Sequence, residues 1–309
     1  MLSEMPEELV TEPTLVWLVD SESKAARKCR ITYTTGKIGW DADYSAVVSE
    51  DDDKLELSGW VTIENNSGVA YKKADVKLIA GDVRRIEEPQ RRREMLVMAA
   101  GAQGGKEGFE EKAFMEYHMY TLGRRTTIKN NQVKQIELIE PVGGIALDKR
   151  YVYEHRVNEK EVQVKIEFEN TKQNGLGIPL PAGKVRVFKK DPADENLEFV
   201  GEDMIDHTPE KEKLSLYIGN AFDIVPEYTL VDSEQGRRWR RRTHRVELKN
   251  RKDESVTVFV DERFSSTVNW SVEKESHEYE KIDANKIRFR INVAADDSAT
   301  VQYTVRESW

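Results

Sequence analysis

The sequence of 309 residues contains a single cysteine, Cys29. One thiol excludes an internal disulfide, and it also excludes a cysteine-based metal cage built from one chain. The cysteine content does not identify the cellular compartment, because a chain without disulfides is compatible with reducing and with oxidising surroundings. No histidine lies near Cys29 in the sequence, so we expect a structural thiol rather than a nucleophile.

Long apolar runs and a basic amino terminus are also missing. The longest early apolar run, Leu15–Val19, is too short for an export or membrane-spanning segment. A signal peptide begins with basic residues, whereas the first lysine here is Lys24. Before it comes an acidic group, Glu4, Glu7, Glu8 and Glu12. We expect neither a signal peptide nor a membrane span, and the residues themselves leave the localisation unknown.

Positive charge is in deficit, with 48 lysines and arginines against 57 acidic residues and a net charge of −9. This balance argues against attraction of the whole molecule to nucleic acid or anionic lipid, so no nucleic-acid partner is expected. Only 38% of the residues are hydrophobic and 34% are charged, which suits strands that each keep one face in water. The length exceeds one comfortable core and predicts two domains.

Alternating apolar residues are abundant, and three such runs end on asparagine. The runs are Ile63–Asn66, Ile166–Asn170 and Val246–Asn250. Alternation places one side of a strand in a core and the other in water, while asparagine tolerates a left-handed backbone and bonds its own main chain where a strand stops. The pattern predicts repeated half-buried strands that end in turns.

Strand-like segments follow one another at spacings near ten residues, including one at Cys29–Tyr33, and no amphipathic helix of three turns occurs. This predicts an all-β fold of two antiparallel β-sandwich (immunoglobulin-like) domains. The first, residues 1–158, is expected to carry a mobile insertion at about 84–112 with a Gly/Ala-rich loop at 99–108. The second, residues 159–309, is expected to be immunoglobulin-like towards its end.

Asp203, Asp206 and His207 are the residues that an enzyme hypothesis would use. Two carboxylates and an imidazole can hold a metal ion or form an acid/base pair, as in a metal-assisted hydrolase. The competing interpretation is a sandwich turn with a capping aspartate. It is favoured because the remaining histidines, at 118, 155, 244 and 277, are scattered singly and complete no metal-ligand spacing.

Other sequences that could suggest chemistry are incomplete. Leu180–Gly183 lacks the Gly-Lys-Ser/Thr of a phosphate loop, so a tight turn before a strand is expected. No Gly-x-Ser-x-Gly elbow supplies a hydrolase nucleophile. Glu50–Asp53 lacks the spacing of a calcium loop and is expected to be a solvated hairpin tip. We therefore expect no catalytic residue, no metal and no cofactor.

The strongest local charge is the arginine run Arg237–Arg242, which surrounds Trp239. Guanidinium groups around an exposed indole can bind phosphates, acidic glycans or stacked bases. The alternative is that these arginines pair with the protein's surplus carboxylates on a neighbouring strand or another subunit. The residues predicted for an anion-binding module are Arg238, Trp239, Arg240 and Arg242.

Several longer segments follow one another in a specific order over roughly residues 31–306, among them Leu57–Gly68, Tyr117–Leu122, Gly175–Val187, Asp206–Pro209 and Gly219–Asp223. In this order and spacing they resemble a bacterial domain family of unknown function that includes mucoidy-inhibitor-A-type proteins. The resemblance is to the carboxy-terminal region of the family, whose members generally begin with an additional domain and often an export signal. The resemblance implies an extracytoplasmic location. It provides no catalytic residues that could be assigned to this sequence.

Together these patterns favour a protein that is not an enzyme and that binds or assembles, with a cell-envelope or surface association. The expected partner is another protein or a second copy of the chain, because sandwich edges and loops suit protein–protein contact and homo-oligomers. The metal-assisted hydrolase and the anion-binding module stay open as alternatives.

Overall fold

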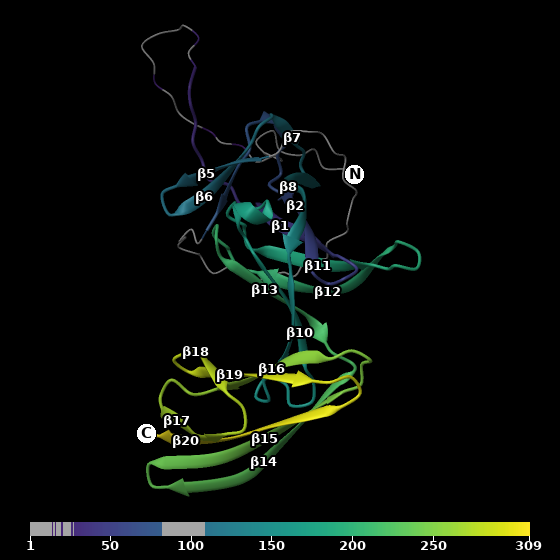
Figure 1. Cartoon of the computed structure of the whole chain (residues 1–309). Helices are drawn as coiled ribbons and strands as arrows, with labels where there is room; N and C mark the ends of the chain where they lie inside the picture. The colour runs from purple at the N-terminus through teal and green to yellow at the C-terminus, as the bar shows by residue number, and fades with distance from the viewer. Residues whose placement is uncertain (1–13, 15, 17–19, 21–25, 27, 82–108) are drawn as a thin grey trace, which may run out of the picture.

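The computed structural model describes residues 14, 16, 20, 26, 28–81 and 109–309. Figure 1 shows two lobes joined by a narrow waist, with β10 (Gln163–Glu169) running between them. We call the lobe around the first hydrophobic core the N-terminal lobe and the lobe around the second the C-terminal lobe. Among the described residues the only helix is the short 3-10 turn η1 (Lys172–Asn174). The all-β prediction is confirmed.

A five-stranded sheet organises the N-terminal lobe, in the order β12-β11-β1-β2-β8. Buried and exposed residues alternate along β1 and β2, as the sequence predicts for strands with one wet face. Gly183 opens β11 where a side chain would collide with the carbonyl oxygen of Ala42 on β1, so a close backbone approach requires glycine there. The bounds are β1 (Ile38–Val48), β2 (Lys54–Asn65), β8 (Gln132–Ala146), β11 (Gly183–Lys190) and β12 (Leu197–Ile205).

Two small sheets cover the same core. One pairs β3 with β7, and the other has the order β4-β6-β5. Leu78, Tyr120 and Leu122 face inward and join the core of the N-terminal lobe. The bounds are β3 (Tyr71–Ala74), β4 (Lys77–Ala80), β5 (Phe109–Phe114), β6 (Tyr117–Leu122) and β7 (Thr126–Ile128).

A six-stranded sheet continues from one lobe into the other, in the order β13-β10-β9-β16-β19-β18. Ile166 and Leu216, on β10 and β13, belong to the first core, whereas Tyr153 and Phe289, on β9 and β19, belong to the second. The two lobes therefore share a continuous ladder. The bounds are β9 (Asp148–Tyr153), β13 (Lys213–Asn220), β16 (Val256–Arg263), β18 (Tyr279–Asp283) and β19 (Lys286–Val293).

The C-terminal lobe is completed by a four-stranded antiparallel sheet of order β14-β15-β20-β17. Inward side chains of this sheet, such as Val246 and Tyr303, pack with Val258 and Phe289 of the six-stranded sheet in one core. The two sheets therefore share one apolar interior. The bounds are β14 (Ile224–Gly236), β15 (Trp239–Asn250), β17 (Asn269–Glu275) and β20 (Ser298–Ser308).

The three asparagines that end alternating runs, Asn65, Asn170 and Asn250, are each fully buried. The Asn250 amide donates to the carbonyl oxygens of Glu254 and Ala294 at 2.8 and 2.9 Å. Its side-chain oxygen accepts from the Lys252 main-chain N–H at 3.1 Å. Asn65 and Asn170 likewise bond main-chain groups on both sides of their turns. Each asparagine replaces the hydrogen bonds that a turn cannot make by itself.

Two features differ from a plain pair of antiparallel sandwiches. Strand β1 pairs in parallel with β11, and β9 pairs in parallel with β16. Parallel neighbours need a long connection, so the chain leaves the N-terminal lobe and returns. Buried residues from Ile166 to Leu216 consequently contribute to the first core although they follow the predicted boundary at 158/159. The immunoglobulin-like character of the lobes stays a prediction.

Some predicted segments have other outcomes. Cys29–Tyr33 is not part of a strand, and Cys29 is exposed. The predicted Gly/Ala-rich loop at 99–108 lies outside the described residues, as does most of the insertion predicted at 84–112. Its last residues belong to β5, which begins at Phe109.

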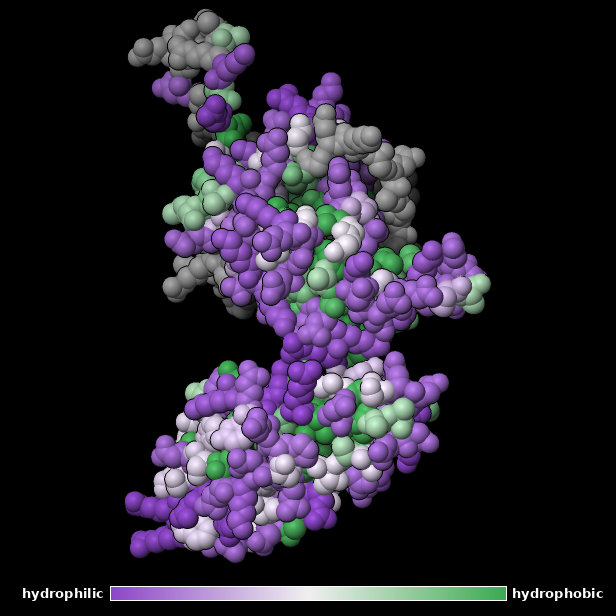
Figure 2. Space-filling model, viewed as in Figure 1, coloured by the Kyte–Doolittle hydropathy of each residue, from purple (hydrophilic) through white to green (hydrophobic). Residues whose placement is uncertain are grey.

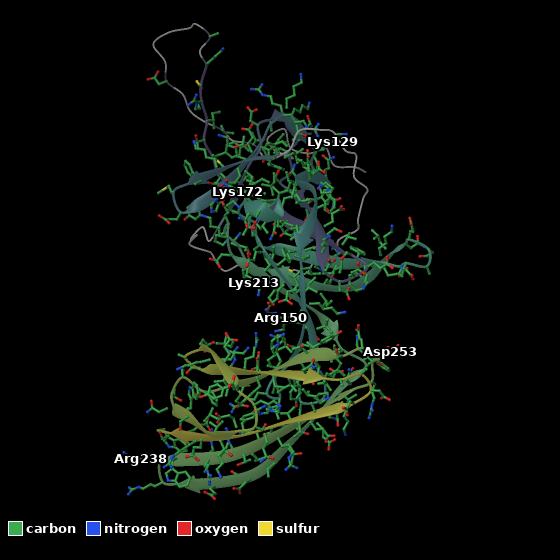
Figure 3. The ribbon with its side chains drawn as sticks, viewed as in Figure 1. Lys129, Arg150, Lys172, Lys213, Arg238 and Asp253 are labelled. Atoms are coloured by element: carbon green, nitrogen blue, oxygen red, sulfur yellow. The ribbon has the colours of Figure 1, made fainter. Side chains whose placement is uncertain are left out.

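The waist is held by charged side chains as well as by the shared sheet. Asp52, in the turn between β1 and β2, accepts hydrogen bonds from Lys149 at 2.7 Å and from Lys189 at 2.5 Å. Arg150 and Lys213, which are labelled in Figure 3, both form ion pairs with Glu167. Figure 2 shows hydrophilic residues over most of the visible face of both lobes.

Candidate functional site

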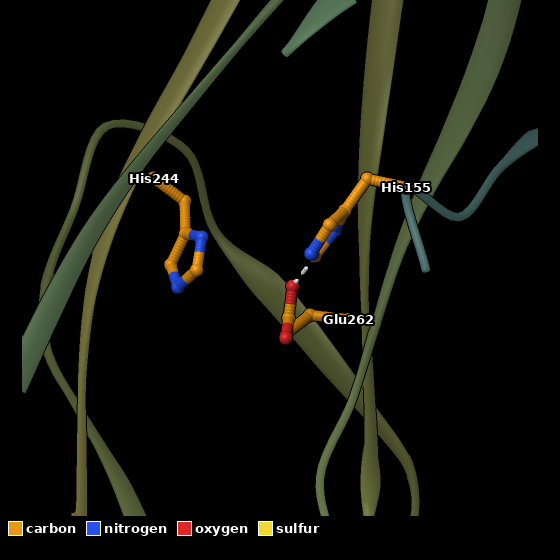
Figure 4. Close-up of side chains that lie close together, drawn as sticks. All are labelled: His155, His244 and Glu262. Atoms are coloured by element: carbon orange, nitrogen blue, oxygen red, sulfur yellow. Dashed lines mark ion pairs between the residues drawn. The ribbon is translucent and has the colours of Figure 1, made fainter. Parts of the chain in front are cut away.

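Two histidines and a glutamate converge inside the C-terminal lobe (Figure 4). His155 lies in the turn that follows β9, His244 lies on β15 and Glu262 lies on β16. Their nitrogen and carboxylate oxygen atoms all lie within 4.8 Å of one another. In the described part of the chain no other three side chains of this kind converge in the same way. We call this group the His-His-Glu cluster.

Local sequence explains why two of these polar side chains point inward. His244 shares the buried face of β15 with Val246 and Leu248, so it occupies a position that the alternation reserves for an apolar residue. Glu262 continues the inward face of Val258 and Val260 on β16. Both side chains are therefore directed between the two sheets by the strand period itself.

Glu262 is the most enclosed member of the cluster, with 1% of its surface exposed. Tyr303 donates a hydrogen bond of 2.7 Å to one of its oxygens, and Arg156 donates one of 3.0 Å to the other. His155 Nδ1 lies 3.4 Å from the oxygen that Tyr303 contacts. Burial raises the pKa of the Glu262 carboxyl, although the Tyr303 hydrogen bond and the Arg156 charge act in the opposite direction.

The two imidazoles are held by aromatic rings. His155 stacks on Tyr228 with ring centres 4.3 Å apart, and His244 stacks on Tyr303 at 5.1 Å. The Tyr228 hydroxyl lies 2.8 Å from His244 Nδ1. Burial, assisted by the charges of nearby arginines, lowers the pKa of His155 to about 4 and that of His244 to about 3. Both rings are neutral near pH 7 and each keeps a lone pair.

The predicted arginine cluster is divided by strand alternation. Arg240 and Arg242 both pair with Glu307 of β20, at 2.7 and 2.8 Å, and Glu307 is almost fully buried. Arg241 points to the other face and pairs with Glu273. This agrees with the interpretation in which the arginines pair with the protein's own carboxylates.

The remaining predicted anion-binding residues lie at the β14–β15 turn. Arg238 is exposed there (Figure 3), and among the described residues no carboxylate lies within ion-pair distance of it. Trp239 begins β15 and carries the Arg306 guanidinium 4.8 Å above its ring centre. The four residues Arg238, Trp239, Arg240 and Arg242 therefore do not form one open basic surface.

The residues of the hydrolase hypothesis are used in main-chain hydrogen bonds. The Asp203 carboxylate accepts from the N–H groups of Tyr217 and Met204 at 2.7 and 2.8 Å. His207 Nδ1 accepts from the Ala182 N–H at 3.0 Å, and Asp206 is exposed. Asp203, Asp206 and His207 are not among the described side chains that converge as metal ligands do.

Sequence reasoning missed the His-His-Glu cluster, because His155 and His244 are separated along the chain and were treated as single histidines. One signal was present. His244 and Glu262 each replace an apolar residue in an otherwise regular alternation. A polar residue at a strand position whose side chain faces the core indicates either an interior group with its hydrogen bonds satisfied or a functional site.

A groove of about 220 Å³ also lies at the waist. Its floor is apolar, with Val48, Ile166 and Ile218, and Phe222 stands almost fully exposed at its margin. Lys149 and Lys189 line it together with their shared partner Asp52, to which each donates a hydrogen bond.

In the part of the chain that the structure describes, no helix has the length and apolar character needed to cross a membrane. The family model described as "Domain of unknown function (DUF4139)" matches residues 29–309. The chain belongs to this family. No curated protein matches it.

Proposed function

We propose that this member of the DUF4139 family is a non-enzymatic binding protein that takes up an extended segment of a protein partner along β14. The observation that carries the proposal is the free edge of this strand. β14 pairs with β15 from Ile224 to Gly236 and is the first strand of its sheet, with no described strand on its other side. An edge of this length presents unpaired N–H and C=O groups to which another chain can add.

The outer half of β14 supports the proposal most strongly. Residues 229–235 are exposed on both faces. At the centre of this segment Leu230 and Val231 keep 45% and 43% of their surfaces in water. An added strand would cover these side chains and bury apolar surface in addition to forming main-chain hydrogen bonds. Pro226 lies in the inner half, where it removes one N–H.

Charge favours a different protein over a second copy. If two copies paired antiparallel with their Leu230 and Val231 residues side by side, Glu227 of each strand would face Glu234 of the other. Like charges directly opposite one another destabilise a strand pair. A partner strand with basic or uncharged residues at these positions avoids the repulsion. We therefore propose a hetero-complex rather than a homo-oligomer.

The two alternative functions have less support. Asp203 and His207, which the hydrolase hypothesis would use, accept hydrogen bonds from main-chain N–H groups. Arg240 and Arg242, which an anion-binding module would use, pair with Glu307. We also propose that the protein has no catalytic residues and that it is associated with the cell envelope. The proposed envelope association is supported by the family resemblance alone.

A site-specific photo-crosslinker tests the proposal in the host cell. A photoreactive phenylalanine analogue at Leu230 is expected to give an adduct of one discrete mass above that of the 35.6-kDa chain. The same analogue at Val157, which is exposed in the turn after β9 of the same lobe, is the matched control and should give none. Leu230→Lys combined with Val231→Lys should abolish binding of the identified partner to the purified protein.

Hydrogen exchange on the purified complex decides whether the contact is strand addition. Main-chain amides in residues 229–235 are expected to become protected, while those of the other edge strand, β17, should not change. An adduct of twice the chain mass would replace the proposed hetero-complex by self-association. No adduct at Leu230, equal adducts at Leu230 and Val157, or a complex without protection on β14 would contradict the proposal.

A further inference from the structure

Two imidazoles and one carboxylate, from three separate elements, face one another between the sheets of the C-terminal lobe (Figure 4). Metal–nitrogen and metal–oxygen bonds of about 2.0–2.2 Å place the ligands of a tetrahedral zinc ion about 3.3–3.5 Å apart. The ligand atoms here lie within 4.8 Å of one another, so small side-chain movements would close them on one ion. We propose that His155, His244 and Glu262 bind one divalent transition-metal ion of the zinc class.

The surroundings of His244 fit a metal ligand. Its Nδ1 lies 2.8 Å from the Tyr228 hydroxyl. When Nδ1 carries the proton and donates it to this oxygen, Nε2 keeps a lone pair. Metal-bound histidines usually have such a partner on their second nitrogen, which fixes the tautomer and the ring orientation. Stacking on Tyr303 further restricts rotation of the ring.

Glu262 and His155 supply the other two ligands. The Glu262 carboxylate is held by Tyr303, and a carboxylate oxygen can accept a hydrogen bond and bind a metal at the same time. His155 Nδ1 already lies 3.4 Å from Glu262. Two histidines with one carboxylate are a ligand set that zinc and iron(II) accept, and it leaves a coordination position for water.

Arg156 is the positive group in contact with Glu262, and the charge of Arg242 also acts on the three residues of the cluster. The Arg156 guanidinium donates to Glu262 at 3.0 Å and repels a second cation. About a third of its side chain (35%) is exposed, so the guanidinium can turn into solvent when the ion takes over its partner. Glu262 has no such freedom. Arg156 therefore sets the affinity of the site, and its removal should strengthen metal binding.

Metal binding would connect three parts of the lobe. His244 belongs to the four-stranded sheet, Glu262 to the six-stranded sheet and His155 to the turn that leads out of β9. One ion would join both sheets and this turn. Since only the folded chain brings the ligands together, the ion is expected to raise the unfolding temperature with its concentration.

Metal titration of the full chain tests the proposal. The protein is stripped with a chelator and titrated with Zn²⁺ and with Co²⁺, by calorimetry and by the visible absorption of bound cobalt. One ion per chain is expected, with an increase in the unfolding temperature. His155→Ala should weaken the affinity at least about tenfold. Arg156→Gln should strengthen it, which a purely structural role of the cluster does not predict. His277→Ala, at an exposed position, is the matched control.

Circular dichroism and the unfolding transition establish that each variant is folded. His155 lies in a turn rather than in a strand, so its variant is the most informative if His244→Ala does not fold. The proposal is wrong if neither ion binds the folded protein, or if His155→Ala and His277→Ala bind with the same affinity as the unaltered chain.

Discussion

The Tyr303 hydroxyl donates a hydrogen bond of 2.7 Å to the Glu262 carboxylate, across the interior of the C-terminal lobe. Tyr303 belongs to β20 of the four-stranded sheet, and Glu262 belongs to β16 of the six-stranded sheet. Both side chains are almost completely buried. This bond therefore connects the two layers of the lobe through polar atoms.

Tyr303→Phe is expected to destabilise the protein by about 1–3 kcal/mol, because the buried Glu262 carboxylate loses a hydrogen-bond donor. The phenyl ring keeps the stacking on His244 and Phe289, so the loss measures the hydrogen bond. Urea unfolding monitored by tryptophan fluorescence gives the difference. Tyr279→Phe, on the exposed strand β18, is the control and should change the free energy of unfolding by less than about 0.5 kcal/mol.

Asn250→Asp is expected to cost about 2 kcal/mol or more. The substitution conserves shape, but it replaces a buried amide that donates to two main-chain carbonyl oxygens by a carboxylate that repels them. Asn292→Asp, on the exposed face of β19, changes the charge equally and should be nearly neutral. Equal unfolding midpoints for the two variants would contradict the role given to the buried asparagines.

Asp52→Asn is expected to reduce stability by about 1–3 kcal/mol at pH 7, since two charge-assisted hydrogen bonds are weakened. Burial by itself raises the pKa of Asp52, but the hydrogen bonds and charges of Lys149 and Lys189 outweigh it and lower the pKa. Asn tolerates the left-handed backbone that Asp52 adopts, with φ of 56°.

The pH dependence of this loss follows from the direction of the shift. A carboxyl with a lowered pKa contributes stability that is fully present above its unfolded pKa, near 4, and is lost as the pH falls through the folded pKa. The difference between Asp52→Asn and the unaltered protein should therefore be constant from pH 7 to about pH 5 and shrink below pH 4. Asp51→Asn, at an exposed neighbouring position, is the matched control. A difference that grows in acid would refute the assignment.

Arg240→Gln combined with Arg242→Gln is expected to destabilise the protein by about 3 kcal/mol, because Glu307 is left buried without a counter-charge. Each single variant should cost less than half of this, since the remaining arginine still pairs with Glu307. Arg238→Gln, at the exposed turn, should lie within about 0.5 kcal/mol of the unaltered chain. Thermal unfolding of the four variants and of the unaltered protein separates these values, and a double variant as stable as the unaltered protein would contradict the role given to the two arginines.

Much of the fold could be predicted because the two-residue period of a strand is visible in the alternation of neighbouring residues. The runs before Asn65, Asn170 and Asn250 alternate, and each ends in a turn held by the asparagine side chain. The left-handed backbone that the sequence allowed at these asparagines is not used, because none of them has a positive φ. Their importance lies in the side-chain hydrogen bonds.

The arrangement of the strands was harder to predict. Alternation fixes which face of β11 is buried, but it does not identify the neighbour of β11 in the sheet. Its pairing with β1 is parallel and joins residues far apart along the chain. The same pairing draws residues after 158 into the first core, which no local pattern around that position indicates.

The sequence by itself determined that this protein is built from half-buried strands with asparagine-stabilised turns, because these properties depend on the alternation of adjacent side chains and on groups a few residues apart. Only the tertiary structure decided that His155, His244 and Glu262 meet, that the arginines of β15 are neutralised by Glu307 and that β14 is left as an edge. These depend on which strands become neighbours, and strand order is set by the packing of whole sheets.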